Sequence, residues 1–252
     1  MKKFLIILLF FLNSFFLEAK EIKIASINWC PQLCPNEKKN GYVIDILELI
    51  FKDSNYKIDI ETYPWTRSIK MTKRAQTLAL LSPAKAEAPD LIYPNIEIGK
   101  QMMCFFTKKD SSWKYTNIDS LKNLQIGIAR DTSIEELNDY IKYNPSQFQF
   151  LPYSENYIQQ SLRKLDRNRF DTFLFTKNST LYKINSLGLK GKYNMAGCVS
   201  SANIYIAFTS NKMYQKEVKK IMSFFDSRMK KLKKTNKIEL ILDNYGLEKW
   251  FK

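Results

Sequence analysis

The sequence predicts an α/β fold of two lobes, each built on a mostly parallel sheet flanked by helices. Strand and helix patterns alternate in two separate stretches, residues 22–81 and residues 124–175. A chain of 252 residues is long enough to bury a core in each stretch. Because strands joined through helices usually pair in parallel, each stretch predicts one helix-covered sheet.

The elements of the first stretch follow from the spacing of its apolar residues. Apolar residues two positions apart predict strands, and those three or four apart predict helices. Pro64 ends one strand and stands near the start of the next helix. The expected elements are strands at 22–27, 56–63 and 77–81, and helices at 41–51 and 65–73.

The second stretch repeats this alternation and is followed by a C-terminal part. Its expected strands cover 124–129 and 170–175, and its helices cover 134–143 and 157–165. After it, the pattern predicts a strand at 204–208. Apolar residues at helical spacing between 218 and 232 then predict a long helix that packs on the core.

The N-terminus predicts a secretory signal peptide. Two lysines precede the apolar run 4–12, and Ala19 supplies a small residue for cleavage. An uncleaved membrane anchor is the alternative, but it needs about 20 consecutive apolar residues, and Asn13 and Ser14 interrupt this segment. We therefore expect residues 20–252 to form a soluble protein outside the cytoplasm.

The four cysteines predict two disulfides. An even number of cysteines in a secreted chain usually forms bridges. The chain has no histidine to complete a zinc site, and three residues between Cys30 and Cys34 is one more than a redox motif has. A local Cys30–Cys34 bridge leaves Cys104 and Cys198 as the second pair. No metal and no cofactor are expected.

The chain is strongly basic, with a formal net charge of +15. Loss of residues 1–19 removes two lysines and Glu18, which leaves +15 − 2 + 1 = +14. Such a charge could attract nucleic acid, anionic lipid or an acidic ligand. The lysines are spread along the chain without a nucleic-acid motif, so no nucleic-acid partner is expected. The absence of histidine also argues against hydrolytic chemistry.

A series of short motifs runs along the mature chain. In order, they are Asn28-Trp29 after the first strand, Gly-Tyr-Val-Ile-Asp-Ile-Leu at 41–47, Tyr-Pro-Trp-Thr-Arg-Ser at 63–68, Ile-Asp-Ser-Leu at 118–121, Arg-Phe-Asp-Thr at 169–172, Tyr-Ile-Ala-Phe at 205–208 and Tyr-Gly-Leu-Glu-Lys-Trp at 245–250. Their order and spacing resemble the bacterial extracellular solute-binding proteins of family 3, the periplasmic receptors of polar amino-acid ABC transporters.

This resemblance implies the type II periplasmic binding protein fold. Two lobes joined by two crossing segments would close on a small polar solute by hinge motion. A signal peptide would cover 1–19, lobe 1 would hold 20–100 plus 205–252, and lobe 2 would hold 101–204. Cys104 and Cys198 would then lie near the crossings. The expected protein is a monomer that delivers its solute to an inner-membrane ABC permease.

Two positions depart from the family pattern. Where amino-acid binders carry an arginine for the ligand's carboxylate, this chain has Glu87, and a carboxylate there repels such a ligand. Where they carry an aspartate for the ligand's ammonium, this chain has Thr176, which stays a candidate contact in the cleft. The solute therefore need not be an amino acid.

Four candidate ligand residues stand on the first lobe, namely Trp29, Trp65, Arg67 and Ser82. Trp29 follows the first strand and either faces the solute or packs over the Cys30–Cys34 loop. Trp65 belongs to the Pro-Trp-Thr-Arg motif, and Arg67 would reach an anionic or planar polar ligand or form a surface ion pair. Ser82 either donates to the ligand or simply ends its strand.

Thr132 and Ser133 are the candidates on the second lobe. They precede the helix expected at 134–143, whose free N–H groups and dipole favour an anion. Family members use this turn to bind the ligand. Thr132 and Ser133 could also cap the helix, either in addition to ligand binding or without it.

Two other functions remain open at this stage. The protein could be a sensor subunit that presents its ligand to a membrane receptor, because the binding step is the same. It could also be a dehydratase-like enzyme on the same scaffold, with Glu87 as acid or base. No catalytic set surrounds Glu87 in the sequence, so an enzyme is not expected.

Overall fold

In the computed structural model of the chain, four strands form the sheet of the first lobe. The description covers residues 19–35, 38–130, 132, 134 and 136–247. β1 lies between β2 and β3 and is parallel to both, while β9 is antiparallel to β3. In sheet order the strands are β2 (Tyr56–Thr62), β1 (Lys20–Ser26), β3 (Ala79–Leu81) and β9 (Ile206–Phe208).

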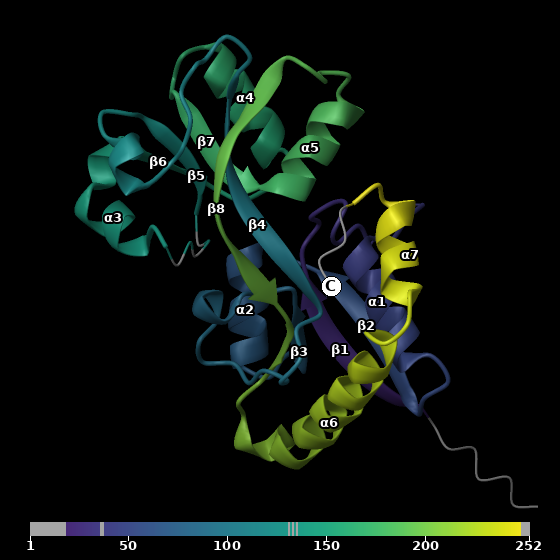
Figure 1. Ribbon diagram of the computed structural model, residues 1–252. Coiled ribbons are helices and arrows are strands. Elements are labelled where there is room, and N and C mark those ends of the chain that lie inside the picture. Colours follow the sequence, from purple (N-terminus) through teal and green to yellow (C-terminus); the bar gives the residue numbers. More distant parts are fainter. Residues whose placement is uncertain (1–18, 36–37, 131, 133, 135, 248–252) are drawn as a thin grey trace, which may run out of the picture.

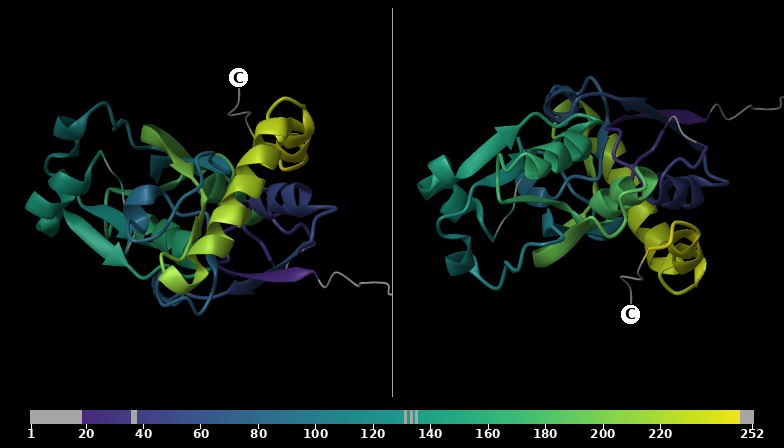
Figure 2. Two further views of the ribbon diagram at one scale, coloured as in Figure 1. Left: turned by 90° about the horizontal axis from the view of Figure 1, so that it is seen from below. Right: turned by 90° about the horizontal axis from the view of Figure 1, so that it is seen from above.

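Helices from both ends of the chain cover this first sheet. α2 packs against β1 and β3, and α1 packs against α6 and α7, which lie beside it in both views of Figure 2. The rings of Phe51 and Phe224 stack 5.5 Å apart between α1 and α6. The four helices are α1 (Tyr42–Phe51), α2 (Trp65–Lys73), α6 (Gln215–Leu232) and α7 (Lys237–Asn244).

Five strands form the sheet of the second lobe. β6, β5 and β7 are parallel, whereas β4 is antiparallel to both β7 and β8. Sheet order gives β6 (Phe148–Leu151), β5 (Ile126–Ala129), β7 (Thr172–Thr176), β4 (Gly99–Lys108) and β8 (Tyr193–Ile204). Its helices are α3 (Asn138–Tyr143), α4 (Tyr157–Asp166) and α5 (Lys177–Ser186).

The long strands β4 and β8 connect the two lobes and run side by side between them (Figure 1). Their pairing begins at Gly99 and Ile204, where the Ile98 N–H donates to the Ile204 carbonyl at 2.9 Å. The predicted fold class, two α/β lobes joined by two crossings, is confirmed. The lobe boundaries at 100/101 and 204/205 stay a proposal.

Both predicted disulfides are present, Cys30–Cys34 and Cys104–Cys198. Cys104 and Cys198 lie opposite each other in the β4–β8 pair, with Cα atoms 3.9 Å apart. The second bridge therefore joins the two connecting strands a few residues from the point where they cross.

Two predicted elements differ from the structure. The helix expected at 134–143 begins only at Asn138, because the Asn138 side chain accepts the Ile134 N–H at 3.0 Å and holds a turn there. The strand expected at 204–208 is divided. Tyr205 leaves the ladder and its N–H donates to the Pro83 carbonyl at 3.1 Å. Within the described ranges, no helix is long and apolar enough to cross a membrane.

Candidate functional site

A loop of the first lobe is hydrogen-bonded to the second lobe. The Trp29 indole N–H donates to the Thr176 hydroxyl at 3.1 Å, and the Asn28 amide donates to the Glu155 carboxylate at 3.0 Å. The Tyr153 hydroxyl donates to the Asn28 carbonyl at 2.9 Å. We call these five residues the latch. Two of the residues predicted to bind ligand, Trp29 and Thr176, therefore contact each other directly.

Aromatic packing and protonation support the latch. The Trp29 ring lies 6.3 Å from the Phe175 ring, against which Tyr153 stacks at 5.7 Å. Burial raises the pKa of Tyr153, and the charges of Glu155 and Tyr157 add to this effect. The phenol thus stays protonated at neutral pH and remains a donor to the Asn28 carbonyl.

The disulfide loop fixes the position of Trp29. Trp29 and Leu33 exchange two backbone hydrogen bonds, at 2.6 and 2.9 Å, across the turn that the Cys30–Cys34 bridge closes. Gly41 packs its backbone against the carbonyl of Gln32, at φ +100°. The Cys30–Cys34 bridge therefore stiffens the loop that carries Asn28 and Trp29 of the latch.

Three buried polar groups of the first lobe have no hydrogen-bond partner among the described residues. One is the amide nitrogen of Gln32, whose side-chain oxygen accepts from the Tyr42 hydroxyl at 2.7 Å. The other two are the Trp65 indole N–H and the Ser82 hydroxyl, and their residues are 5% and 0% exposed. Trp65 begins α2 directly after Pro64, and Ser82 follows the carboxyl end of β3, at φ +69°. Buried donors are normally paired, so these two groups are available to hydrogen-bond a bound molecule.

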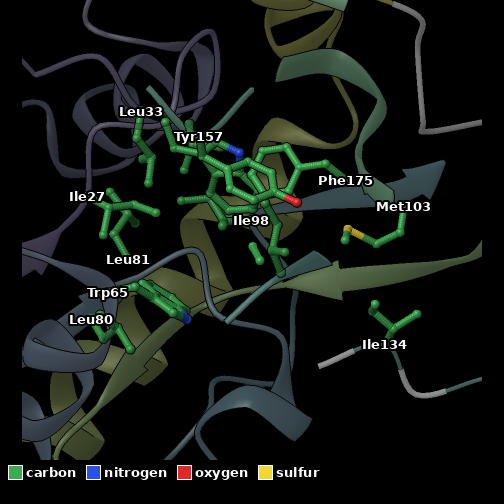
Figure 3. Close-up of a cluster of buried hydrophobic side chains, with 14 of the residues drawn as sticks. Ile27, Leu33, Trp65, Leu80, Leu81, Ile98, Met103, Ile134, Tyr157 and Phe175 are labelled. Atoms are coloured by element: carbon green, nitrogen blue, oxygen red, sulfur yellow. The ribbon is translucent and has the colours of Figure 1, made fainter. Parts of the chain in front are cut away.

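These groups lie where the lobes meet. Figure 3 shows Trp65 with Leu80 and Leu81 of the first lobe, in the same buried cluster as Met103 and Phe175 of the second. Within the described residues, no Asp, Glu, Lys or Arg side chain is buried. The described part of this interlobe region therefore combines apolar walls and neutral hydrogen-bonding groups with the exposed Glu155 carboxylate of the latch.

The remaining predicted residues have other surroundings. Arg67 is exposed, with its guanidinium 5.0 Å from the Tyr63 ring. Thr132 donates its hydroxyl to the Ala129 carbonyl at 2.8 Å. Because α3 begins at Asn138, Thr132 does not stand at a helix N-terminus, so the expected helix-dipole effect is absent there. Ser133 lies outside the described residues.

Glu87 closes a turn after β3. Its carboxylate accepts the Ala84 N–H at 2.8 Å, within the 3₁₀ turn Lys85–Glu87. Lys85 places its ammonium 5.0 Å from the Tyr205 ring at the crossing. At the position where amino-acid binders of the family carry an arginine, this chain thus has a glutamate that stabilises a local turn.

Sequence reasoning missed Asn28, Tyr153 and Glu155 as members of the latch. Asn28 and Tyr153 are 125 positions apart, and Asn28 and Glu155 are 127 apart. No local pattern indicates such pairs. Only the position of Asn28 beside Trp29 at the end of β1 could have indicated it.

Comparison with solved structures places the fold. A histidine kinase sensor domain with similarity to periplasmic binding proteins aligns with a TM-score of 0.74 at 14% identity, over 92% of this chain and 99% of that chain. A structure from a study of glutathione import through GshT and the cystine ABC importer TcyBC of Streptococcus mutans gives 0.72 at 20% identity, over 90% and 94%.

The chain has the periplasmic binding protein fold. An ABC uptake transporter substrate-binding protein from Streptococcus pneumoniae with bound histidine shares this fold, with a TM-score of 0.71 at 15% identity, over 91% of this chain and 93% of that chain. No protein-family model matches the sequence, and no curated protein matches it. At these identities, the periplasmic binding protein fold is what the chain and its structural neighbours share.

Proposed function

We propose that this protein is a periplasmic solute-binding protein that captures a small polar solute between its lobes and delivers it to an ABC permease. The observation that carries the proposal is the pair of buried, unpaired groups on Trp65 and Ser82, in a lobe whose Trp29 loop is hydrogen-bonded to the other lobe through the latch. Structural neighbours include substrate-binding proteins of ABC importers. The signal peptide expected at 1–19 supports export to the periplasm.

The first experiment identifies the solute. A thermal-shift screen of polar metabolites is expected to raise the melting temperature with one chemical class, because a ligand that binds only the folded state stabilises it. The screen includes amino acids, since one structural neighbour holds bound histidine, although Glu87 and Thr176 stand where the family's amino-acid anchors are expected. No stabilisation by any polar solute, confirmed by native mass spectrometry, would contradict solute binding.

Replacing the two unpaired groups is expected to weaken solute binding. Trp65→Phe and Ser82→Ala each remove a hydrogen bond worth about 1–1.5 kcal/mol, or roughly tenfold in affinity, and Trp65 and Ser82 have no competing partner among the described residues. Isothermal titration with the identified solute measures the change. Trp113→Phe is the control, because the Trp113 N–H donates to the Ser120 carbonyl at 2.9 Å. Affinities within twofold of wild type in both variants would remove these residues from the site.

Loss of the latch is expected to favour the open form. Trp29→Phe keeps the ring against Phe175 but removes the bond to Thr176, which is worth about 1 kcal/mol, or roughly fivefold in the ratio of closed to open molecules. Single-molecule energy transfer between dyes on α6 and α4 reports this ratio. Tyr143→Phe, at a residue 74% exposed, is the control. A distribution identical to that of the control would show that the latch does not set closure.

Thr132, Ser133, Thr176 and Arg67 remain proposed contacts of the solute. Thr132 keeps acceptor capacity on its hydroxyl after donating to Ala129, and Thr176 becomes accessible when the Trp29 bond opens. Replacing Thr132 and Ser133 together by alanine should weaken binding while leaving the melting temperature of the empty protein nearly unchanged. Unaltered affinity would exclude both from the site.

A sensing role is the second candidate, favoured by the likeness to a histidine kinase sensor domain. Solute uptake by membrane vesicles carrying the candidate permease distinguishes the roles, since only a transport protein stimulates uptake.

An enzymatic role has less support. The neighbours described above are binding proteins and a sensor domain, and the Glu87 carboxylate is engaged by the Ala84 N–H. Conversion of the identified solute by the purified protein would favour it.

A further inference from the structure

A basic pocket lies on the second lobe, away from the latch. It has a volume of about 480 Å³ and is lined by Gln149, Arg163, Lys164, Arg167 and Arg169. The lining comes from β6, from the end of α4 and from the segment before β7. α4 begins beside the latch at Tyr157, and its lining residues Arg163 to Arg167 lie roughly 9–15 Å along the helix axis from that end.

The arginines that line this pocket have no carboxylate partner among the described residues, where no ion pair involves Arg163, Arg167 or Arg169. The carboxylate nearest in sequence is Asp166, which instead accepts from Lys192 and from the Tyr193 hydroxyl, both at 3.0 Å. Four cations around one hollow repel one another, and a bound anion would relieve that repulsion.

Gln149 and Lys164 hold the wall of the pocket in place. The Gln149 amide donates to the Arg169 carbonyl at 2.6 Å, and the Lys164 ammonium donates to the Gln149 side-chain oxygen at 3.4 Å. Lys164 also lies 5.9 Å from the Phe170 ring. These contacts join β6, α4 and the segment before β7, so the pocket is a defined surface of the fold.

Helix capping explains only part of the cluster. Arg163 and Lys164 stand in the last turn of α4, where cations complement the helix dipole. Arg167 is the C-cap residue, and Arg169 lies beyond the helix. The dipole of α4 therefore favours Arg163, Lys164 and Arg167 but does not account for Arg169.

We propose that the arginine pocket, defined by Arg163, Lys164, Arg167 and Arg169, binds a phosphate group at a site separate from the solute cleft. Arginine forks bind the oxygens of phosphate bidentately, and several around one hollow favour a doubly charged oxyanion over a single carboxylate. The phosphate group belongs either to a small soluble compound or to the headgroup of an anionic lipid. The site is independent of the proposed transport function.

Isothermal titration with inorganic phosphate, at constant ionic strength, tests the pocket. The triple variant R163A/R167A/R169A is expected to bind phosphate at least tenfold more weakly than the wild type. K216A/K219A/K220A, at exposed positions of α6, removes the same charge and is expected to change affinity less than twofold. Equal weakening in both variants, or no phosphate binding by the wild type together with no vesicle binding as described below, would overturn the proposal.

Geometry and source are tested by two further arms. R163K/R167K/R169K keeps the charge but loses the fork, and it is expected to lower phosphate affinity while the melting temperature is retained. Co-sedimentation compares vesicles of pure phosphatidylcholine with vesicles containing phosphatidylglycerol. Binding to the anionic vesicles that the alanine variant loses and the α6 control keeps assigns the lipid headgroup. Phosphate binding without vesicle binding assigns a soluble phosphate compound. Wild-type affinity in the lysine variant would contradict bidentate recognition and overturn the assignment to phosphate.

Discussion

Replacing Cys104 and Cys198 together by alanine is expected to lower the free energy of unfolding by about 5 kcal/mol in the chain-entropy model, because the bridge closes a long loop in the unfolded chain. The two cysteines are 94 positions apart in the sequence. In a protein of this size, such a loss corresponds to a fall of roughly 10–20 °C in melting temperature. Calorimetry and urea unfolding of the oxidised wild type and the variant measure both quantities.

The Cys30–Cys34 bridge provides an internal comparison for this prediction. Its cysteines are only four positions apart, so the same model gives about 2 kcal/mol for its removal. The variant C30A/C34A is therefore expected to lose less than half as much stability as C104A/C198A. An equal or reversed order would show that loop closure does not determine what these bridges contribute.

Gly41→Ala is expected to destabilise the protein by roughly 3 kcal/mol or more, since backbone strain and steric overlap add at one position. Gly41 has φ +100°, and a Cβ there would lie 2.5 Å from the Gln32 carbonyl oxygen and 2.8 Å from the Cys34 nitrogen. Both are backbone atoms of the disulfide loop and cannot rotate away. Urea unfolding monitored by tryptophan fluorescence measures the loss.

Gly191→Ala is the matched control for Gly41. Gly191 also has positive φ, +81°, but an added Cβ would meet nothing within 4 Å. Only the conformational cost of about 1 kcal/mol is expected there. If Gly41→Ala costs no more than Gly191→Ala, the packing of Gly41 against the disulfide loop is not a constraint on the fold.

Elements with a clear apolar period could be predicted from the sequence, and elements without one could not. The helix predicted at 65–73 has those bounds in the structure, because Pro64 marks its start. α5 was missed because its sequence, Lys-Asn-Ser-Thr-Leu-Tyr-Lys-Ile-Asn-Ser, buries Ser179, Thr180 and Ile184 and shows no apolar stripe. β8 was missed for the same reason, because its small and polar residues show no apolar alternation.

The long strand β4 was missed for a different reason. Five consecutive residues from Met103 to Thr107 are buried, because β4 is a central strand between β7 and β8 and helices α4 and α5 pack against it. A strand with both faces covered loses the alternation that identifies half-buried strands. The two connecting strands, which define the architecture, are therefore the elements that local patterns indicate least.

The candidate site could be predicted as single positions but not as contacts. The sequence placed Trp29 after a strand and Thr176 at a position of the family pattern, yet their hydrogen bond joins residues 147 positions apart. Trp65 was predicted from the Pro-Trp-Thr-Arg motif, and Ser82 from its place at the end of a strand. Their lack of a partner depends on burial, which only the folded chain determines.

The passage of the chain from one lobe to the other and back has a consequence for its biogenesis. β9, α6 and α7 come from the end of the sequence but pack with β3 and α1 from the beginning. The second sheet, by contrast, uses only strands between Gly99 and Ile204. During synthesis the polypeptide emerges N-terminus first. The second lobe, which comes from the middle of the chain, can therefore finish folding before the C-terminal segments that complete the first lobe have been made.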